Sequence, residues 1–214
     1  MDTVISRYVI ESSDADIAYC KDLAYQKDMN QSIEYGITYF ENYVKRADTE
    51  ISCRINQARI NLVEKYCDRC ILDIGIGSGE FIRRSNIKVY GYDINPYGIK
   101  WLEERRLFVN PYVEINDNIQ GVTLWDTLEH IENPQELLTK IPSGVFLFVS
   151  LPTFEDLDRL KQSKHYKPNE HYYYFSVDGF RRYITDSGFE MIEHNDCETQ
   201  AGREGITSFV SRRI

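Results

Sequence analysis

Three glycines and one acid are spaced as a binding site for a small molecule requires. The apolar run 71–74 carries Asp73 and is followed by Gly75, Gly77 and Gly79. Glycine adopts positive φ and lets another molecule approach the backbone closely, so a glycine-rich turn after a strand can cradle a ligand. A carboxylate at this position repels a pyrophosphate and favours a ligand with a cationic or donor-rich end.

A second acid, Asp93, closes the next predicted strand and lies 20 residues after Asp73. An acid at the end of that strand can accept both hydroxyls of an adenosine ribose in the adjacent crevice. The dinucleotide fingerprint Gly-x-Gly-x-x-Gly is absent, because its third glycine would fall on Glu80 or Ile82. The spacing therefore indicates an adenosine-containing ligand that is not a dinucleotide.

A third group of polar residues follows the predicted strand 121–126. Asp126 ends this strand, and Glu129 and His130 come directly after it. Ligands of open α/β sheets bind beyond the carboxyl ends of the strands, so this loop should face the same crevice. Glu129 and His130 can serve as a general base or can order the loop, and for His130 we favour ordering.

The segment 165–175 is rich in histidine and aromatic residues and follows a central strand. It is predicted to form part of a lid, residues 154–175, that contacts a second substrate. His171 is the first candidate for a general base in this lid, and His165 is the second. Part of the aromatic residues must belong to the core instead.

The elements that position these residues alternate between strands and helices, which predicts an α/β fold with a mostly parallel sheet. A short connection through Gly202 and Gly205 predicts that the last strand is antiparallel. Residues 14–28 and 31–45 are expected to be helices of an N-terminal appendage. The expected strands are 71–74, 88–93, 113–119, 121–126, 144–151, 189–195 and 206–212, and the expected helices around them are 51–66, 80–84, 96–106, 154–163 and 177–187.

The acid–glycine motif of residues 73–79, followed by Asp93, resembles that of the class I S-adenosylmethionine (SAM)-dependent methyltransferases. The stretch from Asp126 through Glu129 and His130 to Pro134 resembles methyltransferases that act on ubiquinone precursors. The resemblance covers about residues 60–214 and implies a Rossmann-like three-layer sandwich with a seven-stranded sheet. We expect an N-terminal helical cap at 1–55 and a methyltransferase domain at 56–214.

The resemblance also implies roles in binding SAM, whose product is S-adenosylhomocysteine. Asp73 would help to hold the ammonium group, and Asp93 would bind the ribose. Asp117 would hold the adenine amino group, although a plain polar turn explains it equally well. The residues expected to bind the cofactor are Asp73, Gly75, Gly77, Gly79, Asp93, Ile94, Asp117, Trp125 and Asp126.

The expected function is transfer of a methyl group from SAM to an oxygen or nitrogen atom of a small-molecule acceptor. The alternatives are methylation of RNA or a nucleotide, and a non-catalytic partner subunit that binds SAM. The chain of 214 residues has a net charge of -9, which argues against a nucleic-acid partner. The oligomeric state stays open.

The remaining features predict a cytoplasmic protein without a metal site. Met1–Ile10 has no basic start and no long apolar core, so no signal peptide is expected, and no apolar run is long enough for a membrane span. Five cysteines without framework spacing indicate free thiols. Cys67 and Cys70 form a lone Cys-x-x-Cys without a second ligand pair, so we expect no bound metal.

Overall fold

The computed structural model describes residues 17–20, 23–26, 36, 40–41, 44–45 and 47–214. Its main sheet consists of β3 (Cys70–Ile74), β4 (Lys88–Tyr92), β5 (Ile119–Trp125), β6 (Phe146–Pro152), β8 (Phe189–Asn195) and β9 (Ile206–Arg213). These six strands lie in the order β4-β3-β5-β6-β9-β8. Strands β3 to β6 are parallel to one another, and β9 is antiparallel to both of its neighbours. The predicted reversal of the last strand is confirmed.

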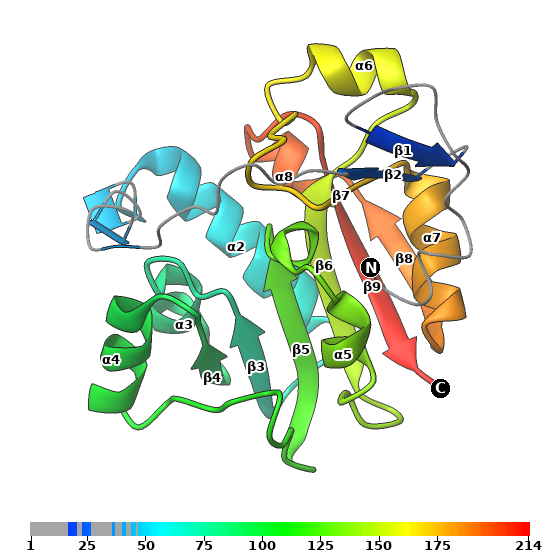
Figure 1. The fold of residues 1–214 in the computed structure, drawn as a ribbon. Helices are drawn as coiled ribbons and strands as arrows, with labels where there is room; N and C mark the ends of the chain where they lie inside the picture. The colour runs from blue at the N-terminus through cyan, green and yellow to red at the C-terminus, as the bar shows by residue number, and fades with distance from the viewer. Residues whose placement is uncertain (1–16, 21–22, 27–35, 37–39, 42–43, 46) are drawn as a thin grey trace.

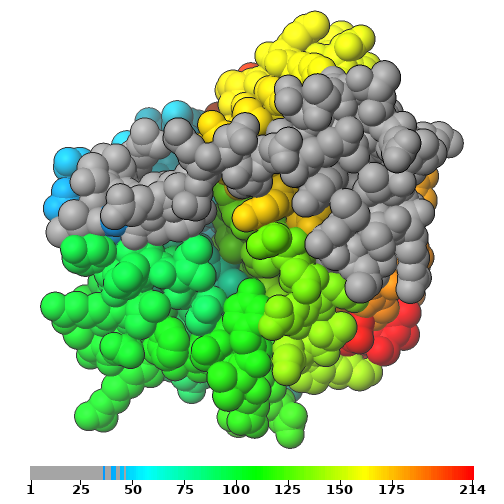
Figure 2. Space-filling view, viewed as in Figure 1, coloured from blue at the N-terminus to red at the C-terminus, as the bar shows by residue number. Residues whose placement is uncertain are grey.

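The described helices connect these strands. They are α2 (Glu50–Glu64), α3 (Glu80–Arg84), α4 (Pro96–Glu104), the 3-10 helix η2 (Leu128–His130), α5 (Pro134–Leu138), α6 (Leu157–Gln162), α7 (Val177–Asp186) and α8 (Cys197–Gln200). Figure 1 shows the arrowheads of β3, β4 and β5 pointing to the side on which α6 and α8 lie. Helix α6, in yellow, forms the top of the face seen in Figure 2. The carboxyl ends of the strands therefore share one side with the segments that follow β6.

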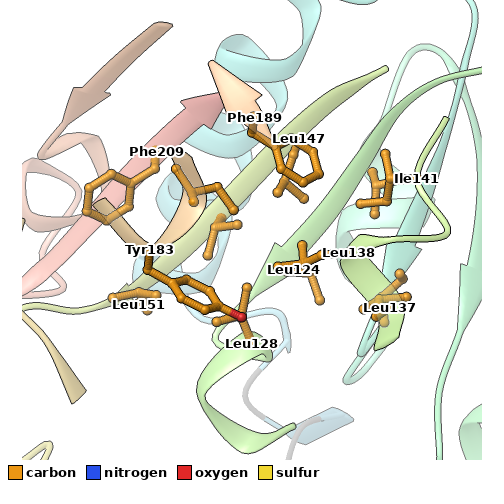
Figure 3. Packing of buried hydrophobic residues seen from close by; sticks show 14 of the residues in the cluster. Leu124, Leu128, Leu137, Leu138, Ile141, Leu147, Leu151, Tyr183, Phe189 and Phe209 are labelled. Atoms are coloured by element: carbon orange, nitrogen blue, oxygen red, sulfur yellow. The ribbon is translucent and has the colours of Figure 1, made fainter. Parts of the chain in front are cut away.

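Two hydrophobic clusters lie on the two faces of the sheet, because successive side chains of a strand point to opposite faces. Ile71 and Phe148 pack with residues of α2 and α3, such as Ile60 and Phe81. The other face carries a larger cluster with residues of α5 and α7 (Figure 3). Its members include Leu72, Leu124, Leu137, Leu138, Leu147, Val149, Phe180 and Tyr183. The sheet thus has an apolar layer on each side and a polar edge at its strand ends.

The predicted third strand at 113–119 is wrong. Helix α4 ends in a turn in which Arg106 has a φ of 55°, and Phe108 then forms an isolated parallel bridge with Gly91. Pro111 has no N–H to donate, and the side chain of Asn110 accepts a hydrogen bond from the backbone N–H of Tyr112. The chain therefore turns after this bridge, and the sheet has six strands among the described residues rather than seven.

The predicted helix at 14–28 is also wrong. The described part of this stretch forms two strands, β1 (Ile17–Cys20) and β2 (Leu23–Gln26). They form a second sheet in the order β1-β2-β7, with β7 at Tyr173–Phe175. Most of the predicted helix 31–45 lies outside the described residues. The predicted domain boundary after residue 55 falls inside α2, and the division of the chain stays a prediction.

Helix α7 confirms the helix predicted at 177–187, and it has a capping residue at each end. The side chain of Ser176 accepts a hydrogen bond of 3.0 Å from the backbone N–H of Gly179, and Gly188 follows the helix with a φ of 86°. Tyr183 on this helix is fully buried in the large cluster. Within the described part of the chain, none of the helices has the length and apolarity that a membrane span needs.

Candidate active site

The glycine turn after β3 has the conformation that its sequence predicts. Gly75, Gly77 and Gly79 have φ values of 80°, 55° and 75°. A Cβ atom on Gly75 would lie 2.3 Å from Oγ1 of Thr127, and one on Gly79 would lie 2.8 Å from the ring of Trp101. The backbone N–H of Gly75 donates to the carbonyl of Tyr92 at 2.8 Å, which ties the turn to β4. Glycine at 75 and 79 is therefore required by both φ and space.

Gly75→Ala should lower the free energy of unfolding by about 2–4 kcal/mol, because it combines the cost of positive φ with a clash against Thr127. Gly144→Ala is the matched control: Gly144 has a φ of 86°, but its Cβ would meet only an Arg212 nitrogen at 3.8 Å. For this control the free energy of unfolding should fall by only about 1–2 kcal/mol. Urea denaturation measures both, and equal losses would show that the clash with Thr127 is absent.

Asp73 lies at the end of β3 with its side chain fully buried. Its Oδ1 accepts a hydrogen bond of 2.7 Å from Oγ1 of Thr123 on β5. Its Oδ2 is buried and has no hydrogen-bond partner among the described residues. Burial raises the pKa of Asp73 to about 7, although the Thr123 hydrogen bond and the positive charge of Arg59 favour the carboxylate. This acid has a free acceptor atom that a ligand can use.

Asp93 follows β4 and lies beside the glycine turn. Its Oδ1 accepts a hydrogen bond of 2.8 Å from the backbone N–H of Asn95. Burial raises the pKa of Asp93, and the backbone N–H groups of Asn95 and Gly77 partly offset this effect. The next residue, Ile94, is 61% exposed. Two of the predicted cofactor residues, Asp73 and Asp93, thus meet at adjacent strand ends, where the charge of Asp93 also disfavours ionisation of Asp73.

The loop after β5 begins at Asp126, which has a φ of 52°. Its Oδ2 accepts a hydrogen bond of 3.0 Å from Arg59 and another from Arg203. Burial disfavours its charge, but these two guanidinium groups lower the pKa of Asp126 below its usual value. Its Oδ1 is buried and has no partner within the described residues.

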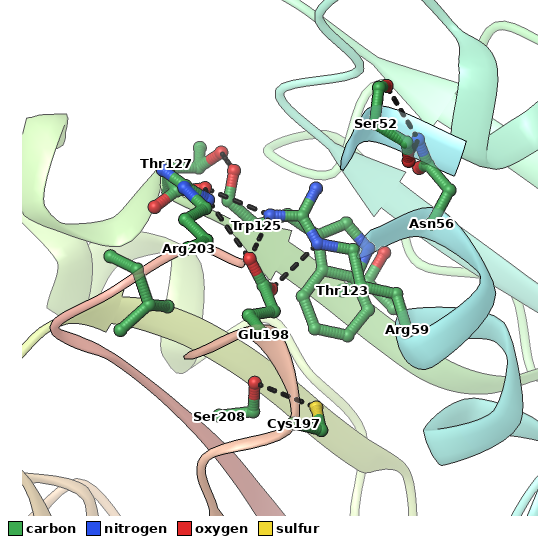
Figure 4. A network of polar contacts seen from close by, with 12 residues as sticks. Ser52, Asn56, Arg59, Thr123, Trp125, Thr127, Cys197, Glu198, Arg203 and Ser208 are labelled. Atoms are coloured by element: carbon green, nitrogen blue, oxygen red, sulfur yellow. Dashed lines mark hydrogen bonds and ion pairs between the residues drawn. The ribbon is translucent and has the colours of Figure 1, made fainter. Parts of the chain in front are cut away.

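Glu198 completes a buried ion cluster with these residues (Figure 4). Its carboxylate accepts hydrogen bonds of 2.7 and 2.9 Å from Arg59 and one of 3.0 Å from Arg203. Its side chain has no exposed surface. The cluster joins α2, the end of β5 and α8, and it fixes the loop that starts at Asp126.

Trp125, the last residue of β5, is buried between an aromatic ring and a cation. The Phe81 ring packs edge-on at a centroid distance of 5.5 Å, and the Arg59 guanidinium lies 5.0 Å from the Trp125 ring centre. The indole N–H has no hydrogen-bond partner in the described part of the chain. Trp125 therefore links the glycine-turn side of the site to the ion cluster.

Glu129, His130 and His171 lie together where η2 meets the segment that precedes β7. The rings of His130 and His171 are 4.6 Å apart and perpendicular. Burial lowers the pKa of both histidines, and with the neighbouring His130 it lowers that of His171 to about 2. Burial, together with the negative charge of Asp126, raises the pKa of Glu129 well above its usual value. The structure thus brings two of the three predicted bases into one buried cluster.

Two predicted site residues lie apart from this arrangement. The Nε2 atom of His165 is 2.9 Å from the carbonyl oxygen of Glu204, so this imidazole contacts the turn that precedes β9. Asp117 is exposed and precedes β5, at the amino end of the parallel strands. The neighbouring Asn118 contacts Cys70 there, whereas Asp73 lies near the carboxyl end of the same strand. We therefore do not place Asp117 in the site.

Sequence reasoning missed the residues that support the acids. Thr123 was part of a predicted strand, and nothing in its spacing marks it as the partner of Asp73. Arg59 and Glu198 are 139 residues apart in the sequence, and Arg203 lies still further along the chain. A lone buried acid at a strand end implies some partner, but only the tertiary structure identifies it.

Comparisons with known proteins are consistent with this geometry. The family model described as "Methyltransferase domain" matches residues 38–194. A search of curated protein sequences found no significant match to this chain.

Solved structures of methyltransferases share the fold at low sequence identity. A SAM-dependent methyltransferase of Thermotoga maritima, described as a possible histamine N-methyltransferase, is 15% identical, with a TM-score of 0.58 and coverage of 82% of this chain and 97% of its own. The glycopeptide N-methyltransferase MtfA, crystallised with SAM, is 11% identical, with a TM-score of 0.54 and coverage of 75% and 94%. A putative methyltransferase in complex with the Haloferax volcanii Trm112 activator is 12% identical, with a TM-score of 0.59 and coverage of 80% and 93%.

The family match spans more than half of the chain, and the fold and the glycine turn agree with it. The chain therefore belongs to the methyltransferase domain family, and it shares its fold with solved SAM-dependent methyltransferases.

Proposed function

We propose that this protein transfers the methyl group of SAM to an oxygen or nitrogen atom of a small-molecule acceptor. The donor site would be the crevice at the carboxyl ends of β3, β4 and β5. The observation that carries this assignment is the buried, unpartnered Oδ2 of Asp73 beside a turn in which a Cβ on Gly75 or Gly79 would clash. A buried acceptor without a partner is costly, and a ligand that donates a hydrogen bond there removes the cost.

The side chains present fit SAM. Asp73 would accept from the ammonium group, the glycine turn would lie against the methionine part, and Asp93 would bind the ribose. Trp125 and Asp126 would lie close to the donor, where the buried Oδ1 of Asp126 and the indole N–H of Trp125 have no partner among the described residues. Ile94, exposed beside Asp93, would cover the nucleoside.

SAM supplies a methyl group on an already activated sulfonium. The protein therefore has to align the two reactants, exclude water and accept a proton where the acceptor carries one. Residues 154–175 are proposed as the lid that excludes water, and residues 1–55 as a cap. His171, His130 and His165 are the proposed proton acceptors. Burial lowers the pKa of each of them, so all three are uncharged bases near neutral pH.

The charge of the chain supports a small acceptor. A net charge of -9 weakens attraction to a phosphate backbone, since nonspecific affinity for nucleic acids comes mainly from Lys and Arg. The lid presents aromatic rings in contact with one another, among them Phe154, Tyr166 and Tyr174. Such rings favour an acceptor with an apolar or aromatic body.

The donor site is tested by calorimetric titration with SAM and S-adenosylhomocysteine. Wild type should bind both ligands with micromolar affinity, and Asp93→Ala should bind them about tenfold or more weakly. Asp117→Ala is the control, because the exposed Asp117 lies at the other end of β5, and it should bind like wild type. Absence of binding to folded wild type would overturn the donor site. If Asp117→Ala also loses SAM binding, Asp117 belongs to the donor site.

The acceptor class is tested by measuring S-adenosylhomocysteine release. Small hydroxylated and amine-bearing aromatic compounds should give turnover, whereas total RNA should not. Turnover on RNA alone would overturn the small-molecule proposal. SAM binding without turnover on either panel would favour a non-catalytic partner subunit.

A further inference from the structure

One carboxylate and two imidazoles converge beside the loop that follows β5. Glu129 and His130 lie on η2, and His171 precedes β7. Each offers a ligand atom, and these atoms all lie within 4.8 Å of one another. Glu129 is 2% exposed and His171 is 3% exposed. The cluster brings together residues separated by about 40 positions in the sequence.

The polar atoms of this cluster lack partners. Both Oε atoms of Glu129 and the Nδ1 atom of His171 are buried, without a hydrogen-bond partner among the described residues. A buried polar group without a partner is costly, and a carboxylate is costlier than a neutral group. Three such atoms in one place are rare in a folded protein and need an explanation. A cation bound to Glu129 and His171 would give each of these side chains a partner.

Contacts outside the cluster orient His130. Its Nδ1 lies 2.9 Å from the carbonyl oxygen of Glu170. An Nδ1–H that donates to this carbonyl leaves the lone pair of Nε2 free, which is the arrangement found around metal-bound histidines.

Two further contacts hold the two segments of the cluster together. The backbone N–H of Tyr172 donates to the carbonyl of Glu129 at 2.8 Å, and the Tyr173 hydroxyl donates to the carbonyl of Glu132 at 2.5 Å. The three side chains are therefore preorganised by the backbone around them.

We propose that Glu129, His130 and His171 bind one divalent first-row transition-metal ion. Two imidazole nitrogens and one carboxylate oxygen suit Zn²⁺, Co²⁺ or Fe²⁺, whereas Mg²⁺ and Ca²⁺ prefer oxygen ligands alone. Three protein ligands leave positions open for water or for an atom of a bound molecule. This proposal goes beyond the proposed function, because the ligand set can be tested without an acceptor. In the metal-bound form the lone pairs of His130 and His171 are engaged, so of the three proposed proton acceptors only His165 would then remain.

The experiment uses the full chain, stripped with a chelator and dialysed. Titration with Co²⁺ should give the visible absorption bands of a protein-bound ion and should saturate near one ion per chain. Calorimetric titration with Zn²⁺ should give the same stoichiometry. Glu129→Gln and His171→Asn should each weaken Zn²⁺ binding by at least about tenfold. His194→Asn, on the exposed side of β8, is the matched control and should bind like wild type.

Two results would overturn the metal site. One is that folded wild type shows neither the Co²⁺ absorption bands nor a heat of Zn²⁺ binding. This test needs no variant, and its result would mean that Glu129 is a buried, protonated acid. The other is Zn²⁺ binding that is equal in wild type and in both ligand variants. SAM titration of the same samples reports on folding and on the donor site independently. Ligand variants that lose Zn²⁺ binding but keep SAM binding therefore support the metal site. A failure of the donor site would be seen separately, as absence of SAM binding in wild type.

Discussion

Asp73→Asn should raise the free energy of unfolding by up to about 4 kcal/mol at pH 8 and should at the same time weaken the binding of SAM. Asp73 is fully buried, and burial raises its pKa from an ordinary value of 3.8 to about 7. The folded state therefore disfavours the charge that the unfolded chain carries above pH 4. Asparagine keeps an acceptor for Thr123 but removes the charge.

The pH dependence of this effect has a definite sign. The pKa of Asp73 is raised on folding, so between about pH 4 and pH 7 the folded state binds more protons than the unfolded state. The stability that wild type has at low pH is then lost progressively as pH rises through this window. Urea denaturation of both proteins at several pH values should show a gap that is small near pH 4 and largest at pH 8.

The exposed acid Asp186 offers a control at the end of α7. Asp186→Asn should change the free energy of unfolding by less than about 0.5 kcal/mol. Calorimetry should show that Asp73→Asn weakens SAM binding by about tenfold or more, because a charged partner of the ammonium group is lost. A variant that is less stable than wild type at pH 8 would mean that Asp73 is stabilised as a carboxylate.

Glu198→Gln should lower the free energy of unfolding by about 3 kcal/mol, because it leaves two partly buried guanidinium groups with a single carboxylate. Glu198 has no exposed side-chain surface, and it accepts hydrogen bonds from both Arg59 and Arg203. Glutamine has nearly the same volume, so the loss would come from charge and not from a cavity. Urea denaturation at neutral pH measures the change.

Glu190→Gln is the matched control for this second prediction. Glu190 lies on the exposed side of β8, and its replacement should change stability by less than about 0.5 kcal/mol. A loss below about 1 kcal/mol for Glu198→Gln would show that the cluster is solvated and contributes little. A large loss would establish that α2, β5 and α8 are held together through this ion cluster.

The sequence alone determined the parts of the protein that depend on local chemistry. An apolar strand, a glycine turn with positive φ and an acid at the next strand end are encoded in about 25 consecutive residues. Each of these features follows from backbone sterics or from burial, which act over a few residues. The α/β fold and the reversed last strand were predictable for this reason, whereas the methyltransferase function was implied by the resemblance of these motifs to a known family.

The tertiary structure alone decided which residues support the site. The missing third strand depended on a bridge between Phe108 and Gly91, and the strands β1 and β2 depended on pairing with β7. The ion cluster joins Arg59 to Glu198, and the proposed metal site joins Glu129 to His171. Such contacts form between segments far apart in the chain, where the free energy of burial and strand pairing outweighs local propensity. Local sequence patterns therefore do not predict them.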